Sequence, residues 1–331
     1  MIIGLTIYKV FDGKDIEVVF EQISSADPFW IMVCILMVLL FIYCESWIIR
    51  KLFARLDIRI GKGEGFLYSC IGFFFCCVTP SASGGQPAQM VYMKKRGIKI
   101  STSTNVLMWV TVLYKMVLVV IGLGLVMFRL DFIRQHMGQT IWIFYLGIFL
   151  NIACVFIMVL LWFKSEWLEA MGSSGIALLR RFKLIKRRDR KRKKLRRFIK
   201  SYDEAFLSLK GDTKVIIKSF IVTLIQRLAL FSITGFVYLS FGMEKFSFFD
   251  VMILQSVISI AVDMLPLPGG SGMSEHLFAV VFAGIFKSSL LIPAMVLSRG
   301  IAYYVQLIFC GLMTVISHFY FTARQKKEEL L

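Results

Sequence analysis

The sequence predicts an all-α, polytopic integral membrane protein, an inverted-topology repeat with two re-entrant, broken-helix hairpins. The 331-residue chain is 58% hydrophobic and 15% aromatic, and its mean hydropathy is +0.74. That composition is too apolar for a soluble domain. Two runs rich in proline and paired glycine also interrupt apolar stretches. We expect one transmembrane domain over 1–331, with the segments half 1 (about 27–128), a linking span (141–163), a basic loop (164–213) and half 2 (about 214–318).

Apolar segments of two lengths make up the chain. Five are long enough to cross a bilayer as helices, whereas three others are too short to cross alone and flank the Pro/Gly runs. The long segments are 29–49, 104–128, 141–163, 214–241 and 289–317, and the short ones are 66–78, 249–265 and 273–286. Residues 1–10 are apolar too, without the length of a span or the pattern of a signal peptide.

The two interruptions are TPSASGGQP at 79–87 and PLPGGSGMSE at 266–275, which together contain four of the six prolines. A broken helix leaves backbone N–H and C=O groups without partners, and a membrane tolerates them only where protein or a water-filled cavity satisfies them. Matching breaks in two halves of a hydrophobic chain are the pattern expected of a transporter's binding site.

Charge placement predicts the topology. Fourteen Lys and Arg residues fall within the twenty-one residues 180–200, against the single acid Asp189. Beside a membrane span this run indicates a cytoplasmic loop against anionic headgroups rather than a nucleic-acid site. With that loop inside, the basic segments 50–62 and 94–99 and the C-terminal tail are also cytoplasmic.

The same orientation predicts the two hairpins. Segment 66–93 lies between two basic, cytoplasmic loops and therefore enters and leaves on the inside, whereas segment 249–286 begins and ends outside. Opposite entry of the two hairpins gives the inverted-topology repeat that many secondary transporters use to build a midplane site. If 66–78 crosses the membrane fully, this argument fails.

Ionisable residues at membrane depth are costly and usually face a cavity or a partner. Lys115, Arg227 and Arg299 lie inside long segments, and Asp263 and Glu275 flank the second break. Each arginine either binds a ligand or pairs with one of these acids or with loosened backbone carbonyls. Three cations with few acids suggest an anionic ligand, because a guanidinium donates two parallel hydrogen bonds to phosphate and half-helix N-termini add N–H donors.

Several other classes of function lack their motifs. No nucleotide-binding or hydrolase pattern is present, and the seven cysteines and three histidines are scattered through the sequence. We therefore expect no metal, no cofactor and no enzymatic activity.

The two breaks resemble the T-P-x-x-S-G-G-E-P and P-x-P-G-G-x-G-x-x-E motifs of the lysylphosphatidylglycerol synthase transmembrane-region family, the flippase-like or UPF0104-type membrane proteins. The run RGIAYY at 299–304 is similar to the family's last-span arginine followed by aromatics. The resemblance spans about 27–318 and excludes the family's soluble aminoacyltransferase domain. It departs at Gln86, where Glu is frequent, and at 114–115, where Tyr-Lys replaces Glu-Arg.

The resemblance implies translocation of a polar phospholipid, or of a lipid-linked anionic headgroup, across a bacterial or archaeal plasma membrane. The expected mechanism is alternating exposure of a midplane site. Secondary transport of a small soluble anion or metabolite, and a membrane enzyme acting on a lipid precursor, are the alternatives. The expected partners are phospholipids with anionic or zwitterionic headgroups, a second copy of the chain and a separate lipid-modifying enzyme, and no nucleic acid.

The residues predicted to bind the substrate are those of the two breaks together with the ionisable residues and one aromatic of the spans. They are Thr79, Pro80, Ser83, Gly84, Gly85, Gln86, Lys115, Arg227, Asp263, Pro268, Gly269, Gly270, Gly272, Glu275, Arg299 and Tyr303.

Overall fold

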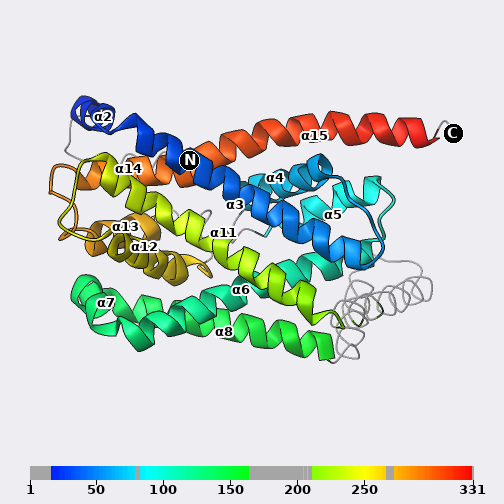
Figure 1. The fold of residues 1–331 in the computed structure, drawn as a ribbon, viewed down its shortest axis with the longest axis horizontal. Helices are drawn as coiled ribbons and strands as arrows, with labels where there is room; N and C mark the ends of the chain where they lie inside the picture. Colours follow the sequence, from blue (N-terminus) through cyan, green and yellow to red (C-terminus); the bar gives the residue numbers. More distant parts are fainter. Residues whose placement is uncertain are drawn as a thin grey trace, which may run out of the picture.

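The structure is a computed structural model that describes residues 16–79, 83–163, 204, 207, 211–265 and 272–329. Within these residues it is built from helices, which run roughly along one long axis (Figure 1). Their bounds are α2 Ile16–Ser24, α3 Pro28–Arg55, α4 Lys62–Val78, α5 Gly85–Lys95, α6 Ile100–Phe128, α7 Leu130–Met137, the 3₁₀ turn η2 Gly138–Thr140, α8 Ile141–Phe163, α11 Thr213–Ser240, α12 Phe248–Val262, α13 Met273–Val281, α14 Leu291–Arg299, the π-helix η4 Gly300–Val305 and α15 Gln306–Glu329.

Five helical segments of the described chain are long and apolar enough to cross a membrane, and each overlaps one predicted span. They are Pro28–Arg55, Ile100–Phe128, Leu130–Leu160, Thr213–Ser240 and Leu291–Phe321. The prediction of an all-α, polytopic membrane protein is confirmed. The basic run at 180–200 and the apolar residues 1–10 lie outside the described residues.

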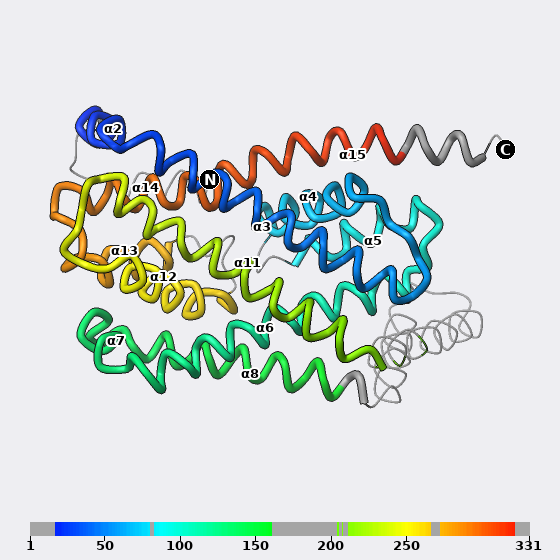
Figure 2. The backbone as a smooth tube through the Cα atoms, viewed as in Figure 1, coloured from blue at the N-terminus to red at the C-terminus, as the bar shows by residue number. Residues whose placement is uncertain are grey.

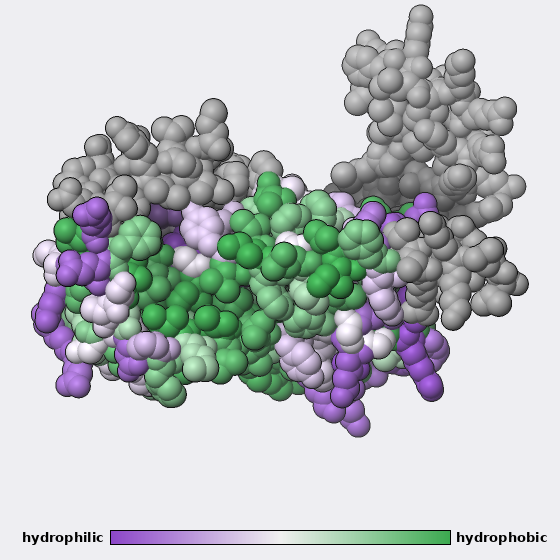
Figure 3. Space-filling view, turned by 90° about the horizontal axis from the view of Figure 1, so that it is seen from above, coloured by the Kyte–Doolittle hydropathy of each residue, from purple (hydrophilic) through white to green (hydrophobic). Residues whose placement is uncertain are grey.

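The outer surface has the polarity that a bilayer requires. Hydrophobic residues form a band across the middle of the face shown in Figure 3, and hydrophilic residues gather at both ends. Large apolar side chains in this bundle are exposed, such as Met127 at 78% and Phe319 at 70%. An exposed apolar surface of this extent marks contact with lipid or another apolar partner.

Local sequence sets where the helices begin. Asp27 caps α3 by accepting a hydrogen bond of 2.9 Å from the backbone N–H of Phe29, and Pro28 occupies the first helical turn. Asp212 caps α11 in the same way, through the N–H of Val215 at 3.1 Å. These caps satisfy N–H groups that would otherwise lack a partner at the helix start.

The first hairpin, α4 with α5, has its base at the end of the bundle where α6 begins. Arg96, just after α5, forms an ion pair of 2.5 Å with Glu64 in the first turn of α4. It also donates a hydrogen bond of 3.2 Å to the carbonyl of Arg59. Because only residues 96–99 separate α5 from α6, both arms of this hairpin return to the start of α6 (Figure 2).

The second hairpin, α12 with α13, has its base at the opposite end of α6. Asp250, in the first turn of α12, pairs with Arg129 at the end of α6. The ring of Phe286, just after α13, lies 5.5 Å from that of Tyr238 at the end of α11. The two hairpins therefore enter the bundle from opposite ends. Re-entry into a bilayer and the inverted repeat stay predictions.

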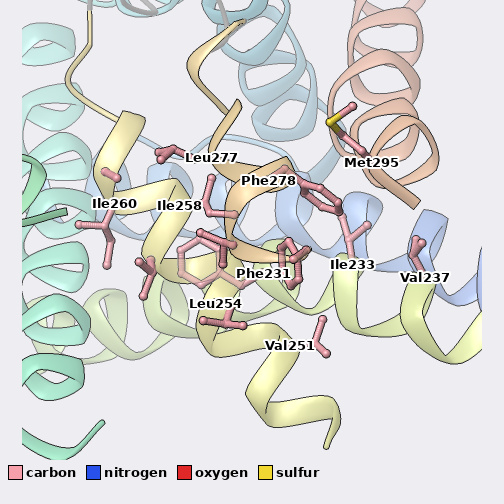
Figure 4. Packing of buried hydrophobic residues seen from close by; sticks show 14 of the residues in the cluster. Phe231, Ile233, Val237, Val251, Leu254, Ile258, Ile260, Leu277, Phe278 and Met295 are labelled. Atoms are coloured by element: carbon pink, nitrogen blue, oxygen red, sulfur yellow. The ribbon is translucent and has the colours of Figure 1, made fainter. Parts of the chain in front are cut away.

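The main core packs the second hairpin against the scaffold. Figure 4 shows Phe231 of α11 beside Ile258 of α12 and Phe278 of α13, all of them buried. α8 approaches α12 closely at Gly147, where an added Cβ would lie 2.4 Å from the carbonyl oxygen of Ile260. Small residues allow such backbone contact between helices in membranes. The described arms of the second hairpin are thus packed into the bundle.

Candidate functional site

A cavity of about 610 Å³ lies in the middle of the bundle, between the described inner ends of the two hairpins. The end of α4, the start of α5, the end of α12 and the start of α13 contribute to its wall. The remaining wall comes from the middle of α3, α6 and α11, from α8, and from the junction of α14 with η4. The described parts of both Pro/Gly breaks thus adjoin one chamber.

Asp263, directly after α12, is held by two neighbouring residues of α6. The hydroxyl of Tyr114 donates to one carboxylate oxygen and the ammonium of Lys115 to the other. Lys115 Nζ also lies 3.0 Å from the sulfur of Met264. The side chains of Lys115 and Asp263 are only 9% and 12% exposed. A buried charge is stable only when paired, so this ion pair joins the far end of α12 to α6.

Glu275, in the first turn of α13, organises the other arm of the second hairpin. Its Oε1 accepts a hydrogen bond of 3.0 Å from Nε of Arg299, and its Oε2 accepts from the backbone N–H of Gly272 at 2.6 Å. Gly272 has φ +90°, a conformation that favours glycine. The acid caps α13 and fixes Arg299 at once, which leaves fewer free N–H donors at this helix start than the sequence suggested.

Arg227 of α11 lies at the cavity wall and is 9% exposed. Its guanidinium carbon is 4.6 Å from the ring centre of Phe41 and 4.2 Å from that of Tyr114. Cation–π contacts of this kind stabilise a desolvated arginine. Glu45 of α3 lines the same cavity and accepts a hydrogen bond of 3.3 Å from the side chain of Gln226.

The ionic balance of the site differs from the sequence expectation. Three cations line the cavity, but Glu45 and Asp263 line it as well, and Glu275 is bonded to Arg299. The expectation of few acids at this depth is therefore wrong, because the sequence count omitted Glu45. With equal numbers of cations and acids in these residues, a purely anionic ligand is no longer the natural match.

The tip of the first hairpin is held by neutral contacts. Thr79 Oγ1 donates to the carbonyl of Phe75 at 2.6 Å and accepts from the N–H of Gly84 at 2.9 Å, so it bridges the break. Gln86 donates to the side chain of Thr111 on α6. A Cβ on Gly85 would lie 2.7 Å from the backbone oxygen of residue 72, so glycine permits the close approach of α4 and α5.

The last span is not a continuous α-helix, because η4, a π-helix, follows Arg299 directly. Tyr303 within it donates a hydrogen bond of 2.8 Å to the carbonyl of Cys77, near the end of α4. π-Helical turns inside α-helices are frequent at functional sites. Here the turn brings one aromatic residue of the last span to the tip of the first hairpin.

The structure brings most described candidates together. Eight of them line the cavity: Ser83, Gly85, Gln86, Lys115, Arg227, Asp263, Arg299 and Tyr303. Four others do not line it: Gly84 is adjacent to lining residues and Glu275 is bonded to the lining residue Arg299, while Thr79 is hydrogen-bonded to Gly84 and Gly272 to Glu275. The candidates Pro80, Pro268, Gly269 and Gly270 lie outside the described residues.

Glu45 and Gln226 are cavity residues that the sequence predictions missed. Glu45 carried a usable signal, since it is an ionisable residue inside a long apolar segment and meets the same criterion as Arg227. Gln226 carried a weaker one, because neutral polar residues are ordinary helix contacts within membranes. Only the packing of α3 on α11 shows that both residues face the chamber.

Comparison with known proteins agrees with the two motifs. A family model described as the lysylphosphatidylglycerol synthase TM region matches residues 1–310. A UPF0104 membrane protein of Archaeoglobus fulgidus is 22% identical over 314 residues, covering 91% of this chain and 90% of that protein. A UPF0104 membrane protein of Pyrococcus horikoshii is 25% identical over an alignment of 331 residues, covering 95% of each. The chain therefore belongs to the lysylphosphatidylglycerol synthase transmembrane-region family.

Proposed function

We propose that this protein moves a polar phospholipid headgroup across the plasma membrane of a bacterium or archaeon, through the cavity between the two hairpins. The strongest support comes from two ion pairs, one at the inner end of each arm of the second hairpin, beside the cavity. They are Lys115 with Asp263 and Arg299 with Glu275. Charges are expensive at this depth, and their concentration around a chamber is typical of a transport pathway.

The size of the cavity suits a headgroup. A volume of about 610 Å³ lies in the range of small-molecule sites. The acyl chains of a phospholipid would stay in the surrounding bilayer, against the exposed apolar band. The chain would therefore shield only the polar part of the lipid, which is the part that resists crossing hydrocarbon.

The opposite entry of the hairpins suggests the transport step. When the tip of one hairpin withdraws from the cavity, the chamber would open toward the end of the bundle from which that hairpin enters. Alternate withdrawal of the two tips would expose one site first to one side and then to the other. The proposal involves no catalysis by this chain, and we expect no aminoacyl transfer.

Reconstitution in liposomes tests the proposal. Lipids labelled on an acyl chain are placed in both leaflets, and a membrane-impermeant quencher reports how fast inner-leaflet lipid reaches the outside. We expect faster exchange with the protein than in protein-free liposomes, and loss of that gain in Arg299→Ala. Lys287→Ala, which removes an exposed cation away from the cavity, is the matched control and retains the gain.

Two results would contradict the proposal. One is exchange no faster than in protein-free liposomes, together with uptake of a soluble organic anion by the same vesicles, which would favour secondary transport. The other is equal lipid exchange in the wild type and in Arg299→Ala, which would exclude the pairs of the second hairpin from transport.

A further inference from the structure

Arg227 differs from the other two cations of the cavity. Lys115 and Arg299 each form an ion pair with an acid, whereas Arg227 has no ion pair in the part of the chain that the structure describes. Its Nε is buried without a hydrogen-bond partner among those residues. A buried donor without a partner is destabilising, and more so when it is charged, so this position favours an acceptor arriving from outside the chain.

The surroundings of Arg227 leave it ready to bind an anion. The rings of Phe41 and Tyr114 contact the guanidinium without using its hydrogen-bonding capacity, because cation–π contacts engage the face of a ring rather than an acceptor atom. Arg227 lines the cavity, and the described residues supply no hydrogen-bond acceptor to its Nε. A guanidinium with free N–H donors is suited to a phosphate or a carboxylate, which accepts two parallel bonds.

Glu45 is the acid that belongs with Arg227. Phe41 and Glu45 are one turn apart on α3, and Gln226, next to Arg227, donates to the carbonyl of Phe41 at 3.0 Å and to Glu45 Oε2 at 3.3 Å. Arg227 acts on Glu45 electrostatically, but the described residues contain no direct ion pair between them. This cation and this acid therefore face one cavity as a separated pair.

We propose that Arg227 and Glu45 determine specificity for a zwitterionic headgroup, with the anionic group of the ligand on Arg227 and its ammonium on Glu45. The inference rests on the proposed function and narrows its substrate class. Within each of the other two ion pairs, the cation and the acid neutralise each other. Arg227 and Glu45 are therefore the positive and the negative group that the cavity offers to a ligand. A phosphate ester that carries an amine satisfies both, whereas an anionic lipid supplies no ammonium to pair with Glu45.

Binding to the purified protein in detergent tests the inference directly. The probes are dihexanoyl phosphatidylethanolamine, which is zwitterionic, and dihexanoyl phosphatidylglycerol, which is anionic and otherwise similar. Affinity is measured from the ligand-induced rise in melting temperature. We expect the zwitterionic lipid to bind about tenfold more tightly, since one charge-assisted hydrogen bond contributes at least that factor. Glycerophosphoethanolamine is the same headgroup without acyl chains. Weaker binding of this compound than of the lipid indicates a lipid ligand, and equal binding indicates a soluble one.

Two variants assign the subsites. In Glu45→Gln, which keeps the size and polarity of the side chain, we expect the preference to fall by about tenfold while phosphatidylglycerol still binds. In Arg227→Gln, we expect both lipids to lose affinity. Glu244→Gln and Lys218→Gln change exposed residues, the latter on the same helix as Arg227, and serve as controls. The melting temperature without ligand verifies that each variant is folded.

The outcomes separate this inference from the proposed function. Equal affinity for the two lipids, or a preference that Glu45→Gln leaves unchanged, overturns the inference even if liposomes show rapid lipid exchange. A preference that depends on Glu45, combined with no lipid exchange in liposomes, supports the inference and overturns translocation as the function.

Discussion

The hydroxyl of Tyr303 donates a 2.8 Å hydrogen bond to the backbone carbonyl of Cys77, so the last span holds the tip of the first hairpin. The carbonyls at the end of a helix lack partners within that helix, and the break at 79–87 prevents the chain from supplying them by continuing the α4 helix. A side chain from elsewhere must therefore do so. Tyr303 therefore stabilises the contact between the last span and α4 and also lines the cavity.

We expect Tyr303→Phe to lower the free energy of unfolding by about 1 kcal/mol, the usual contribution of one hydrogen bond. The ring is retained, so any change comes from the hydroxyl. The melting temperature of the purified protein measures the effect. Tyr304→Phe is the control, because Tyr304 makes no hydrogen bond to the first hairpin among the described residues. Equal losses in the two variants would contradict the assignment.

The pair of Lys115 with Asp263 predicts strong coupling between α6 and α12. We expect Lys115→Met and Asp263→Asn each to destabilise the protein by about 3 kcal/mol, because each leaves one buried charge unpaired. The double variant should lose much less than the sum of the two, since both charges are then absent. A double-mutant cycle on unfolding free energy tests this. Additive losses would show that the two residues act independently.

The contact of α8 with α12 predicts that replacing Gly147 lowers the stability of the protein. Gly147→Ala would place a Cβ 2.4 Å from the carbonyl oxygen of Ile260, and backbone cannot move aside as a side chain can. We expect a loss of about 1–3 kcal/mol. At Gly124, on α6, a Cβ would have nothing within 4 Å, so Gly124→Ala should be neutral or slightly stabilising. Thermal unfolding of the two variants gives the comparison.

The opposed hairpin bases predict a pattern of accessibility. Single cysteines at Lys62 and Lys94 should react with a membrane-impermeant maleimide from the cytoplasmic side, and cysteines at Glu244 and Lys287 from the outer side. All four native residues are exposed in the structure. The unmodified chain gives the background from its native cysteines. Reaction of positions 62 and 94 from opposite sides would mean that α4 and α5 together cross the membrane.

Much of the fold could be predicted from the sequence because the bilayer limits the possibilities. A long apolar segment such as 214–241 must form a helix to satisfy its backbone hydrogen bonds in a bilayer. The bounds of α11, Thr213–Ser240, differ from this prediction by one residue at each end. Bounds were less accurate where a helix ends inside protein. The predicted segment 273–286 extends five residues past Val281, because local turns continue the apolar pattern after α13 stops.

The site was harder to predict because it depends on which charges face which. Asp263 and Glu275 were evident beside the second break, but their pairing with Lys115 and Arg299 is a property of helix packing. The sequence is compatible with either a free or a paired state for each arginine, and the two differ in the structure: Arg299 is paired with Glu275, whereas Arg227 has no ion pair among the described residues. The sequence pattern around Arg299 does not predict the π-helix that follows it.

That π-helix also sets the rotational phase of the last span. Each residue of an α-helix turns the chain by about 100°, and a π-helical turn holds one residue more than an α-helical turn. Arg299 faces the cavity, whereas Ile308 and Leu312 of α15 lie outward, 64% and 63% exposed. If η4 tightened into an α-helix, the two parts would rotate against each other by about one residue's angle, and Arg299 could leave Glu275 without any bend in the helix axis.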